Sequence, residues 1–268
     1  MPHYEAASGE RLEGVWQVSG TVRLRVLGRL GVENGPRWLD GSALPGRQGR
    51  IVLAYLALTH YPVARDDLAD VVWRDALTAS WERDLSAVVS KVRAALDSIG
   101  LGWTLHGGFG CYELQLPPGS RVDAEDAVRF VEDAEWAWRT GRRDVALPAA
   151  STAANLARRP LLPAEQGLWV ERRRDALRET LLRALDVLVD GLAGGRYEHD
   201  ALRYATEALA LDPYRETGYV RLMRLHIGRG NRAEALRAYE QCRAILARDL
   251  GVAPSPQTKA VYHEVLGP

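Results

Sequence analysis

Two stretches of the second half repeat at an offset of 34 residues, and this spacing limits what the chain can fold into. EHDALRYATEALAL, which starts at Glu198, aligns with RAEALRAYEQCRAI, which starts at Arg232, and Ala201 then falls on Ala235. Both stretches space their apolar residues as an amphipathic helix does, with small residues where a second helix would touch them. The repeat therefore predicts stacked pairs of helices.

The whole region from Arg121 onwards has helical periodicity and no convincing strand pattern. Its 34-residue period is that of tetratricopeptide helix pairs, so we predict an all-α, tetratricopeptide-like domain over residues 121–268. The charge run ERRRDALR at residues 171–178 is expected on a solvated face, and the tryptophans at 136, 138 and 169 in the core. Gly, Pro and Asp separate seven predicted helices: 124–140, 144–157, 167–193, 200–211, 215–229, 233–250 and 255–266.

Residues 21–118 follow another pattern. Val22, Leu24 and Val26 alternate with arginines as in a half-buried strand, and Asn34-Gly35 supplies a hairpin turn. Helical spacing then marks residues 46–60, 65–73 and 81–96, and two alternating runs surround a glycine-rich turn within residues 102–116. This order predicts a winged helix that ends near PPGS at 117–120, after a tail of residues 1–20. The predicted fold class is mainly α with a small β component.

The third of these helices, Trp81 to Leu96, has one apolar side and an unusual outward side. A helix that enters the major groove of DNA needs short side chains at its centre and a few groups that reach bases and phosphates. For an isolated helix, a solvated surface is the favoured alternative. The outward side offers the mixture that DNA binding requires: Arg83, Ser86, Ala87, Ser90, Lys91 and Arg93.

Three further side chains are candidate DNA contacts. Arg47 and Arg50 open the first helix, where a solvated arginine pair is an equally good interpretation. His106 is the one possible cation of the predicted hairpin. The 35 basic and 35 acidic residues give a net charge of zero, so any DNA binding depends on a local arrangement of groups.

Sequence motifs exclude several functional classes. The chain has no phosphate loop, zinc-protease helix, nucleophile elbow or dinucleotide turn, so we expect no enzyme, no catalytic residue, no cofactor and no metal. Cys111 and Cys242 lie far apart and are expected to be small buried hydrophobes. Neither a long apolar run nor a signal peptide appears, and this favours the cytoplasm over a membrane.

Several motifs together resemble a known family of bacterial regulators. They are LRVLG, GRQGRIVLAYL, DDLADVVW, LSAVVSKVRAAL, GLWVERRRDALRETLLRALDVL and the long stretch from DPYRETGYV to GVAPSPQT. Residues 22–116 resemble the OmpR-type winged-helix DNA-binding domain, and residues 121–266 resemble the bacterial transcriptional activation domain. That pairing is similar to the SARP-type antibiotic regulatory proteins. The resemblance implies an activator that binds direct repeats in double-stranded promoter DNA, pairs with a second copy of itself there, and engages RNA polymerase holoenzyme.

The chain departs from the family pattern in its predicted wing, and this departure supports a second hypothesis. Cys111 stands before Tyr112 where the family commonly has glycine, and the basic residue common near the tip is missing. The alternative is a helical adaptor that binds a protein partner, with a degenerate winged helix that no longer binds DNA. If the DNA-binding hypothesis holds, the winged helix is expected to recognise DNA without residues 121–268.

Overall fold

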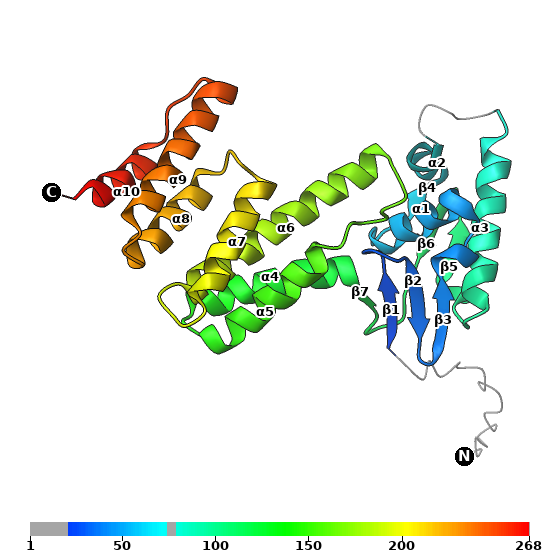
Figure 1. Ribbon diagram of the computed structural model, residues 1–268. Helices are drawn as coiled ribbons and strands as arrows, with labels where there is room; N and C mark the ends of the chain where they lie inside the picture. Colours follow the sequence, from blue (N-terminus) through cyan, green and yellow to red (C-terminus); the bar gives the residue numbers. More distant parts are fainter. Residues whose placement is uncertain (1–20, 74–78, 268) are drawn as a thin grey trace, which may run out of the picture.

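The computed structural model describes residues 21–73 and 79–267, so the tail predicted for residues 1–20 lies outside the described residues. Two lobes lie side by side, one of mixed α and β structure and one made of helices (Figure 1). This arrangement confirms the predicted fold class, with a small β component in a mainly α chain.

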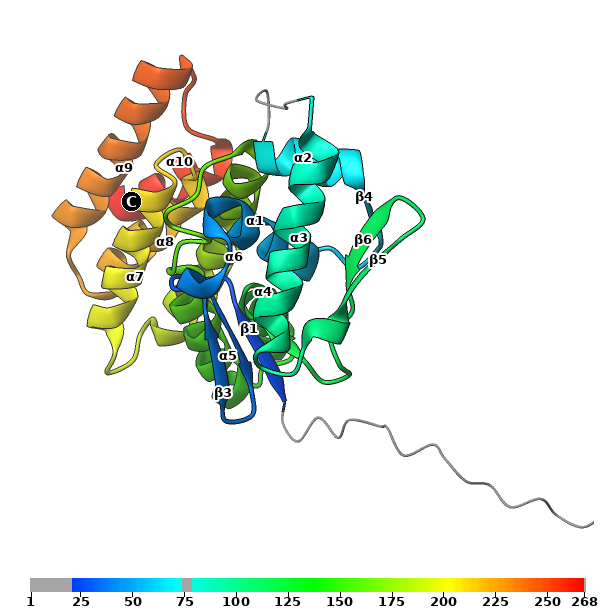
Figure 2. The same ribbon diagram turned by 90° about the vertical axis from the view of Figure 1, so that its right-hand side faces the viewer.

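The mixed lobe has the predicted order of sheet, three helices and hairpin. Its second sheet has the strand order β4-β6-β5, and the β5–β6 hairpin lies next to α3 (Figure 2). Each of the three predicted helices is present. The elements are β1 (Val22–Arg25), β2 (Gly31–Asn34), β3 (Arg37–Asp40), η1 (Gly41–Ala43), α1 (Gly46–Ala57), β4 (Val63–Ala64), α2 (Arg65–Trp73), α3 (Trp81–Asp97), η3 (Gly102–Thr104), β5 (Leu105–Gly108) and β6 (Cys111–Leu114).

The helical lobe contains all seven predicted helices, and its repeat is visible in the structure. Helices α7 and α9 have 14 residues each, and both of their ends are offset by the period found in the sequence. Ala201 and Ala235 are fully buried at equivalent positions, so small residues do allow close helix packing there. The elements are α4 (Asp123–Arg139), α5 (Arg143–Ala157), α6 (Leu168–Leu192), α7 (Glu198–Leu211), α8 (Glu216–Gly228), α9 (Arg232–Ile245), the π-helix η4 (Leu246–Leu250) and α10 (Pro256–Leu266).

One short strand contradicts the prediction that no strand follows residue 121. Strand β7 (Arg121–Val122) pairs in parallel with β1 and completes a four-stranded sheet of order β3-β2-β1-β7. Directly after it, an Asp123 carboxylate oxygen accepts hydrogen bonds from the backbone N–H groups of Val26 and Leu27, at 2.8 and 3.3 Å. A two-residue strand is too short to show alternation, and only its pairing partner reveals it.

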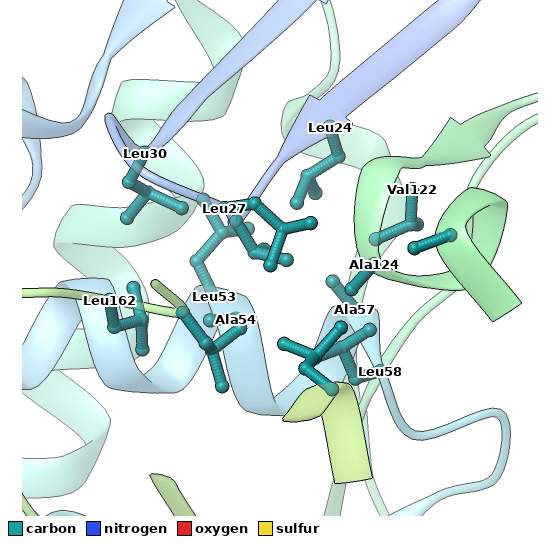
Figure 3. Packing of buried hydrophobic residues seen from close by; sticks show 14 of the residues in the cluster. Leu24, Leu27, Leu30, Leu53, Ala54, Ala57, Leu58, Val122, Ala124 and Leu162 are labelled. Atoms are coloured by element: carbon teal, nitrogen blue, oxygen red, sulfur yellow. The ribbon is translucent and has the colours of Figure 1, made fainter. Parts of the chain in front are cut away.

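The largest apolar cluster of the described residues spans both lobes. Leu27 follows β1, Leu53 and Ala57 lie on α1, and all three belong to one cluster with Ala124 at the start of α4 (Figure 3). Leu162, from the segment between α5 and α6, packs into the same cluster. Burial of a leucine contributes about 1.5–3 kcal/mol, so this cluster alone makes the two lobes depend on each other.

Polar contacts reinforce the junction between the lobes. The Glu165 carboxylate is 2% exposed and accepts a hydrogen bond of 2.6 Å from Arg50 Nε. Arg47 Nε lies 3.6 Å from the same carboxylate, and the Arg47 guanidinium donates to the carbonyl oxygens of Val72 and Gln166. Two arginines of α1 therefore neutralise one buried acid of the helical lobe.

The charge run at the start of α6 is mostly exposed, as predicted, but two of its arginines also bond to backbone carbonyls. Arg173 donates to the Leu58 carbonyl oxygen of the mixed lobe, at 3.0 Å. Arg174 donates to three backbone carbonyls of the segment between α5 and α6, those of Leu161, Leu162 and Glu165. Both arginines therefore bond to backbone carbonyls at the junction between the lobes.

The three tryptophans of the helical lobe differ from the core positions expected for them. Trp136 is exposed, and the Arg142 guanidinium carbon lies 4.1 Å from its ring centre. Trp138 is half-buried, and Trp169 is half-buried with its ring edge-on to Tyr55 at 5.1 Å between centroids. The core prediction is therefore wrong for Trp136 and only partly right for the other two.

Candidate nucleic-acid interface

Helix α3 lies on the outer side of the mixed lobe, away from the helical lobe (Figures 1 and 2). Its apolar stripe is fully inserted into the core, which confirms the predicted inward side: Leu85, Val88, Val89, Val92 and Leu96. Glu82 and Asp84 stand in the first turn, where the helix dipole favours carboxylates. The opposite side of the helix therefore faces solvent along its length.

The centre of that outward side is made of short side chains between cations. Ala87 and Ser90 are exposed in the middle of the helix, with Arg83 one turn before Ala87 and Lys91 next to Ser90. Within residues 21–73 and 79–267, neither Arg83 nor Lys91 has an ion-pair partner closer than 4.0 Å. Arg83, Ala87, Ser90 and Lys91 thus form one exposed surface.

Two of the predicted site residues also hold the hairpin against α3. Arg93 is half-buried, and its Nε donates a hydrogen bond of 3.0 Å to the Leu105 carbonyl oxygen at the start of β5. The Ser86 hydroxyl donates to the Glu82 carbonyl oxygen at 2.8 Å and lies 3.4 Å from the hydroxyl of buried Tyr112. Arg93 and Ser86 therefore set the position of the wing relative to α3.

The β5–β6 hairpin is the wing that the sequence predicted. His106 is exposed and stands opposite Glu113 in the strand register, so its nearest cross-strand neighbour is an acid. Gly107 stands opposite Tyr112, and a Cβ there would come within 3.0 Å of the tyrosine ring. The glycine thus allows the buried ring to lie across the hairpin.

Arg65 is a candidate contact that the sequence interpretation missed. It begins α2, and its backbone N–H donates to the Gly110 carbonyl oxygen in the wing turn at 3.0 Å. Its guanidinium carbon lies 5.3 Å from the Tyr112 ring centre, and among the described residues its buried Nε has no hydrogen-bond partner. The Nε itself is buried and not accessible to a phosphate, so Arg65 is a candidate through its half-buried position between α2 and the wing. The one sequence signal for it is a basic residue at the start of a predicted helix.

The structure places Arg47 and Arg50 at the junction between the lobes. Arg50 donates to Glu165 with its Nε, and its side chain is 28% exposed. The Arg47 side chain is 41% exposed although it also bonds to two carbonyls. A contact of either arginine with the DNA backbone stays a prediction, because both already have protein partners.

The described residues offer few other reactive groups. No cluster of three His, Cys, Asp or Glu side chains in this part of the chain is arranged to hold a metal ion. Cys242 is fully buried, and burial raises the pKa of its thiol to about 11, whereas Cys111 is half-buried on β6. None of the described helices has both the length and the apolar character to cross a membrane.

Known regulators align with most of the chain. The transcriptional regulatory protein MoaR1 of Mycobacterium tuberculosis is 28% identical over 261 residues, which cover 92% of this chain and 80% of MoaR1. EmbR of the same species is 27% identical over 85% of this chain and 60% of its own length. The regulatory protein AfsR of Streptomyces coelicolor is 27% identical over 92% of this chain and 24% of its own. The chain thus spans less than two thirds of EmbR and about a quarter of AfsR.

A solved structure has the same fold. M. tuberculosis EmbR in complex with a low-affinity phosphopeptide matches with a TM-score of 0.81 and 24% identity, over 91% of this chain and 65% of the EmbR chain. Residues 122–266 match the family described as "Bacterial transcriptional activator domain", a region that is more than half of the 268 residues. The chain therefore belongs to the bacterial transcriptional activator domain family, and it is a SARP-type regulator of transcription rather than an enzyme.

Proposed function

We propose that this regulator binds promoter DNA in a sequence-specific way by inserting α3 into the major groove. The observation that carries the proposal is the outward side of α3, where exposed Ala87 and Ser90 lie between Arg83 and Lys91. The major groove is about 12 Å wide and admits one α-helix. Short side chains at the centre let the helix backbone approach the bases, and the cations reach bases and phosphates on either side.

The side chains of α3 then have different tasks. Arg83 can form paired hydrogen bonds with a guanine, and the hydroxyls of Ser86 and Ser90 can bond to base edges. Ala87 allows the close approach and can touch a thymine methyl group. Lys91 lies towards the edge of this side and suits a phosphate.

Around the helix, further cations suit the DNA backbone. Arg65 lies half-buried beside the wing turn, and Arg93 lies where the wing meets α3. His106 on β5 is exposed, and Arg47 is the more exposed of the two arginines at the start of α1. These groups would orient the protein on the duplex without reading its sequence.

We propose that the helical lobe carries the activating contacts. It lies on the side of the molecule away from α3, so a DNA-bound chain leaves it open to RNA polymerase holoenzyme or to a second copy of itself (Figure 1). Two copies on direct repeats would place their half-sites about one helical turn apart, roughly 10 to 11 base pairs. Insertion of about five base pairs should then abolish cooperative binding. Unchanged cooperativity would contradict the tandem arrangement.

The salt dependence of DNA binding tests the proposal against the adaptor alternative. A duplex is first selected by the full chain from a randomised pool, and its affinity is then measured over a series of NaCl concentrations. Phosphate contacts release counterions, so log affinity should fall steeply and linearly with log salt. A flat or absent response would favour the helical adaptor. Val89→Asp serves as a control for folding, because it buries an unpaired charge in the core of the mixed lobe.

A further inference from the structure

The tip of the wing exposes an aromatic ring that the fold does not use. Phe109 is one of only two phenylalanines in the chain and is fully exposed, at 109% of its reference area. It stands between Gly108 and Gly110 in the turn that joins β5 to β6. Figure 2 shows this turn at the outer end of the hairpin, clear of the rest of the lobe.

Both the side chain and the backbone at this position cost stability. An apolar ring in water forgoes the free energy that burial would provide. The backbone of Phe109 is left-handed, with φ of 50°, a conformation that is unfavourable for a bulky residue and easy for glycine. Folding alone would therefore favour glycine at position 109, since its neighbours on both sides are already glycines.

The tip is held at a fixed place relative to α3. Arg93 bonds the start of β5 to α3, and the Tyr112 hydroxyl lies 3.4 Å from Ser86 of the same helix. On the other side, the Arg65 N–H donates to the Gly110 carbonyl oxygen, one residue from the aromatic ring. Because the hairpin cannot swing freely, Phe109 approaches any duplex held by α3 at one defined distance from the major-groove contact.

Charge cannot explain how this wing would bind DNA. Residues 105–116 contain no lysine and no arginine, and His106 stands opposite Glu113. The groove next to an occupied major groove is a minor groove, whose walls of sugar rings and stacked bases accept apolar side chains. Apolar wedges at such positions partly unstack a base step and bend the duplex.

We propose that Phe109 is an apolar wedge that enters the minor groove beside the α3 contact and partly unstacks one base step. This inference rests on the proposed DNA-binding function. It assigns part of the sequence preference to a residue that forms no hydrogen bond with a base. The binding site should contain a flexible pyrimidine–purine step at a constant distance from the bases read by α3, because such steps deform most easily.

The test compares wild type with Phe109→Gly and Phe109→Leu, using the full chain and the selected duplex. One arm measures affinity against salt, and the other measures the fluorescence of 2-aminopurine placed at the pyrimidine–purine step, which rises when the base unstacks. Tyr61→Ala is the matched control, because Tyr61 is also exposed but precedes β4, near the base of the hairpin.

Phe109→Gly should weaken binding about tenfold, as expected for one lost base–aromatic contact, and should abolish the fluorescence rise. The salt slope should not change, since the ring carries no charge. Phe109→Leu should retain most of the affinity, and Tyr61→Ala all of it. The thermal stability of Phe109→Gly should equal or exceed that of wild type, which would exclude unfolding as the cause of its weaker binding.

The possible failures can be told apart. If wild type selects no sequence, the proposed function and the wedge both fail. If wild type binds a specific duplex but Phe109→Gly binds it equally well with the same fluorescence, the wedge is wrong and the proposed function stands. If Phe109→Gly binds DNA normally but no longer retains RNA polymerase on the promoter, the tip contacts a protein and the wedge is again wrong.

Discussion

Replacement of Glu165 by alanine should weaken the junction between the lobes by about 2–3 kcal/mol. Removal of one partner of a buried ion pair costs about 3–5 kcal/mol, because the other charge is left without compensation. The Glu165 carboxylate is 2% exposed, but its partners Arg50 and Arg47 are 28% and 41% exposed. Both arginines can therefore regain water after the substitution, which places the expected loss below the fully buried range. Glu165→Gln should lose less, about 1–2 kcal/mol, since its amide oxygen still accepts a hydrogen bond.

Urea unfolding followed by circular dichroism measures this loss. Glu207→Ala is the matched control, because Glu207 also pairs with an arginine, Arg158 at 2.7 Å, but is 27% exposed. An exposed pair contributes about 0–1 kcal/mol, so the control should lose little. The double variant Arg50→Ala/Glu165→Ala should show a coupling of about 1–3 kcal/mol. A loss for Glu165→Ala no larger than that of the control would refute the argument.

The same variants test whether Arg50 contacts DNA. If its guanidinium serves only the junction, Arg50→Ala should lower stability and leave the salt slope of DNA binding unchanged. If it contacts a phosphate, the slope should fall by about one unit. The second outcome would support the prediction from the sequence that Arg50 contacts the DNA backbone.

Further predictions concern the reading helix, the shared core and the buried thiol. Arg83→Ala should lose about 1–3 kcal/mol of binding free energy on the selected duplex and should relax the sequence preference at one base pair. Lys91→Ala should instead weaken binding to all duplexes alike. If folded Arg83→Ala binds with unchanged affinity and specificity, Arg83 does not contact the bases. A fragment of residues 21–118 should not fold stably, because it exposes the apolar face that α4 and the segment before α6 cover; a cooperative unfolding transition of the fragment would contradict this. With burial raising its thiol pKa to about 11, Cys242 should react with Ellman's reagent at pH 8 only after unfolding, and a rapid reaction of both thiols in the native protein would contradict its burial.

The junction between the two lobes is a feature that the sequence did not reveal. From its sequence, the winged helix was expected to recognise DNA without residues 121–268. In the structure, β7 belongs to the sheet of the mixed lobe, and the Asp123 carboxylate accepts hydrogen bonds from the backbone that follows β1. The PPGS turn at residues 117–120 predicts a domain boundary, but the apolar core continues across it.

The sequence by itself determined the features that depend on near neighbours. The apolar stripe of α3 follows from side-chain spacing within one helix, and the match of α7 to α9 follows from a repeat that can be counted along the chain. Both predictions are confirmed because helix periodicity is a local property. The mixture of Ala87, Ser90 and Lys91 on the outward side was also readable, since residues outside the stripe of a surface helix meet solvent.

Only the tertiary structure decided which distant groups meet. Arg50 and Glu165 are separated by 115 residues, and no local pattern distinguishes an arginine that binds a buried acid from one that faces solvent. Likewise, an aromatic residue in a glycine-rich turn is compatible with a buried or an exposed ring, and the hairpin's position against α3 leaves Phe109 exposed. Long side chains and short strands take their partners from the packing of the whole chain, so their roles appear only when the lobes are in place.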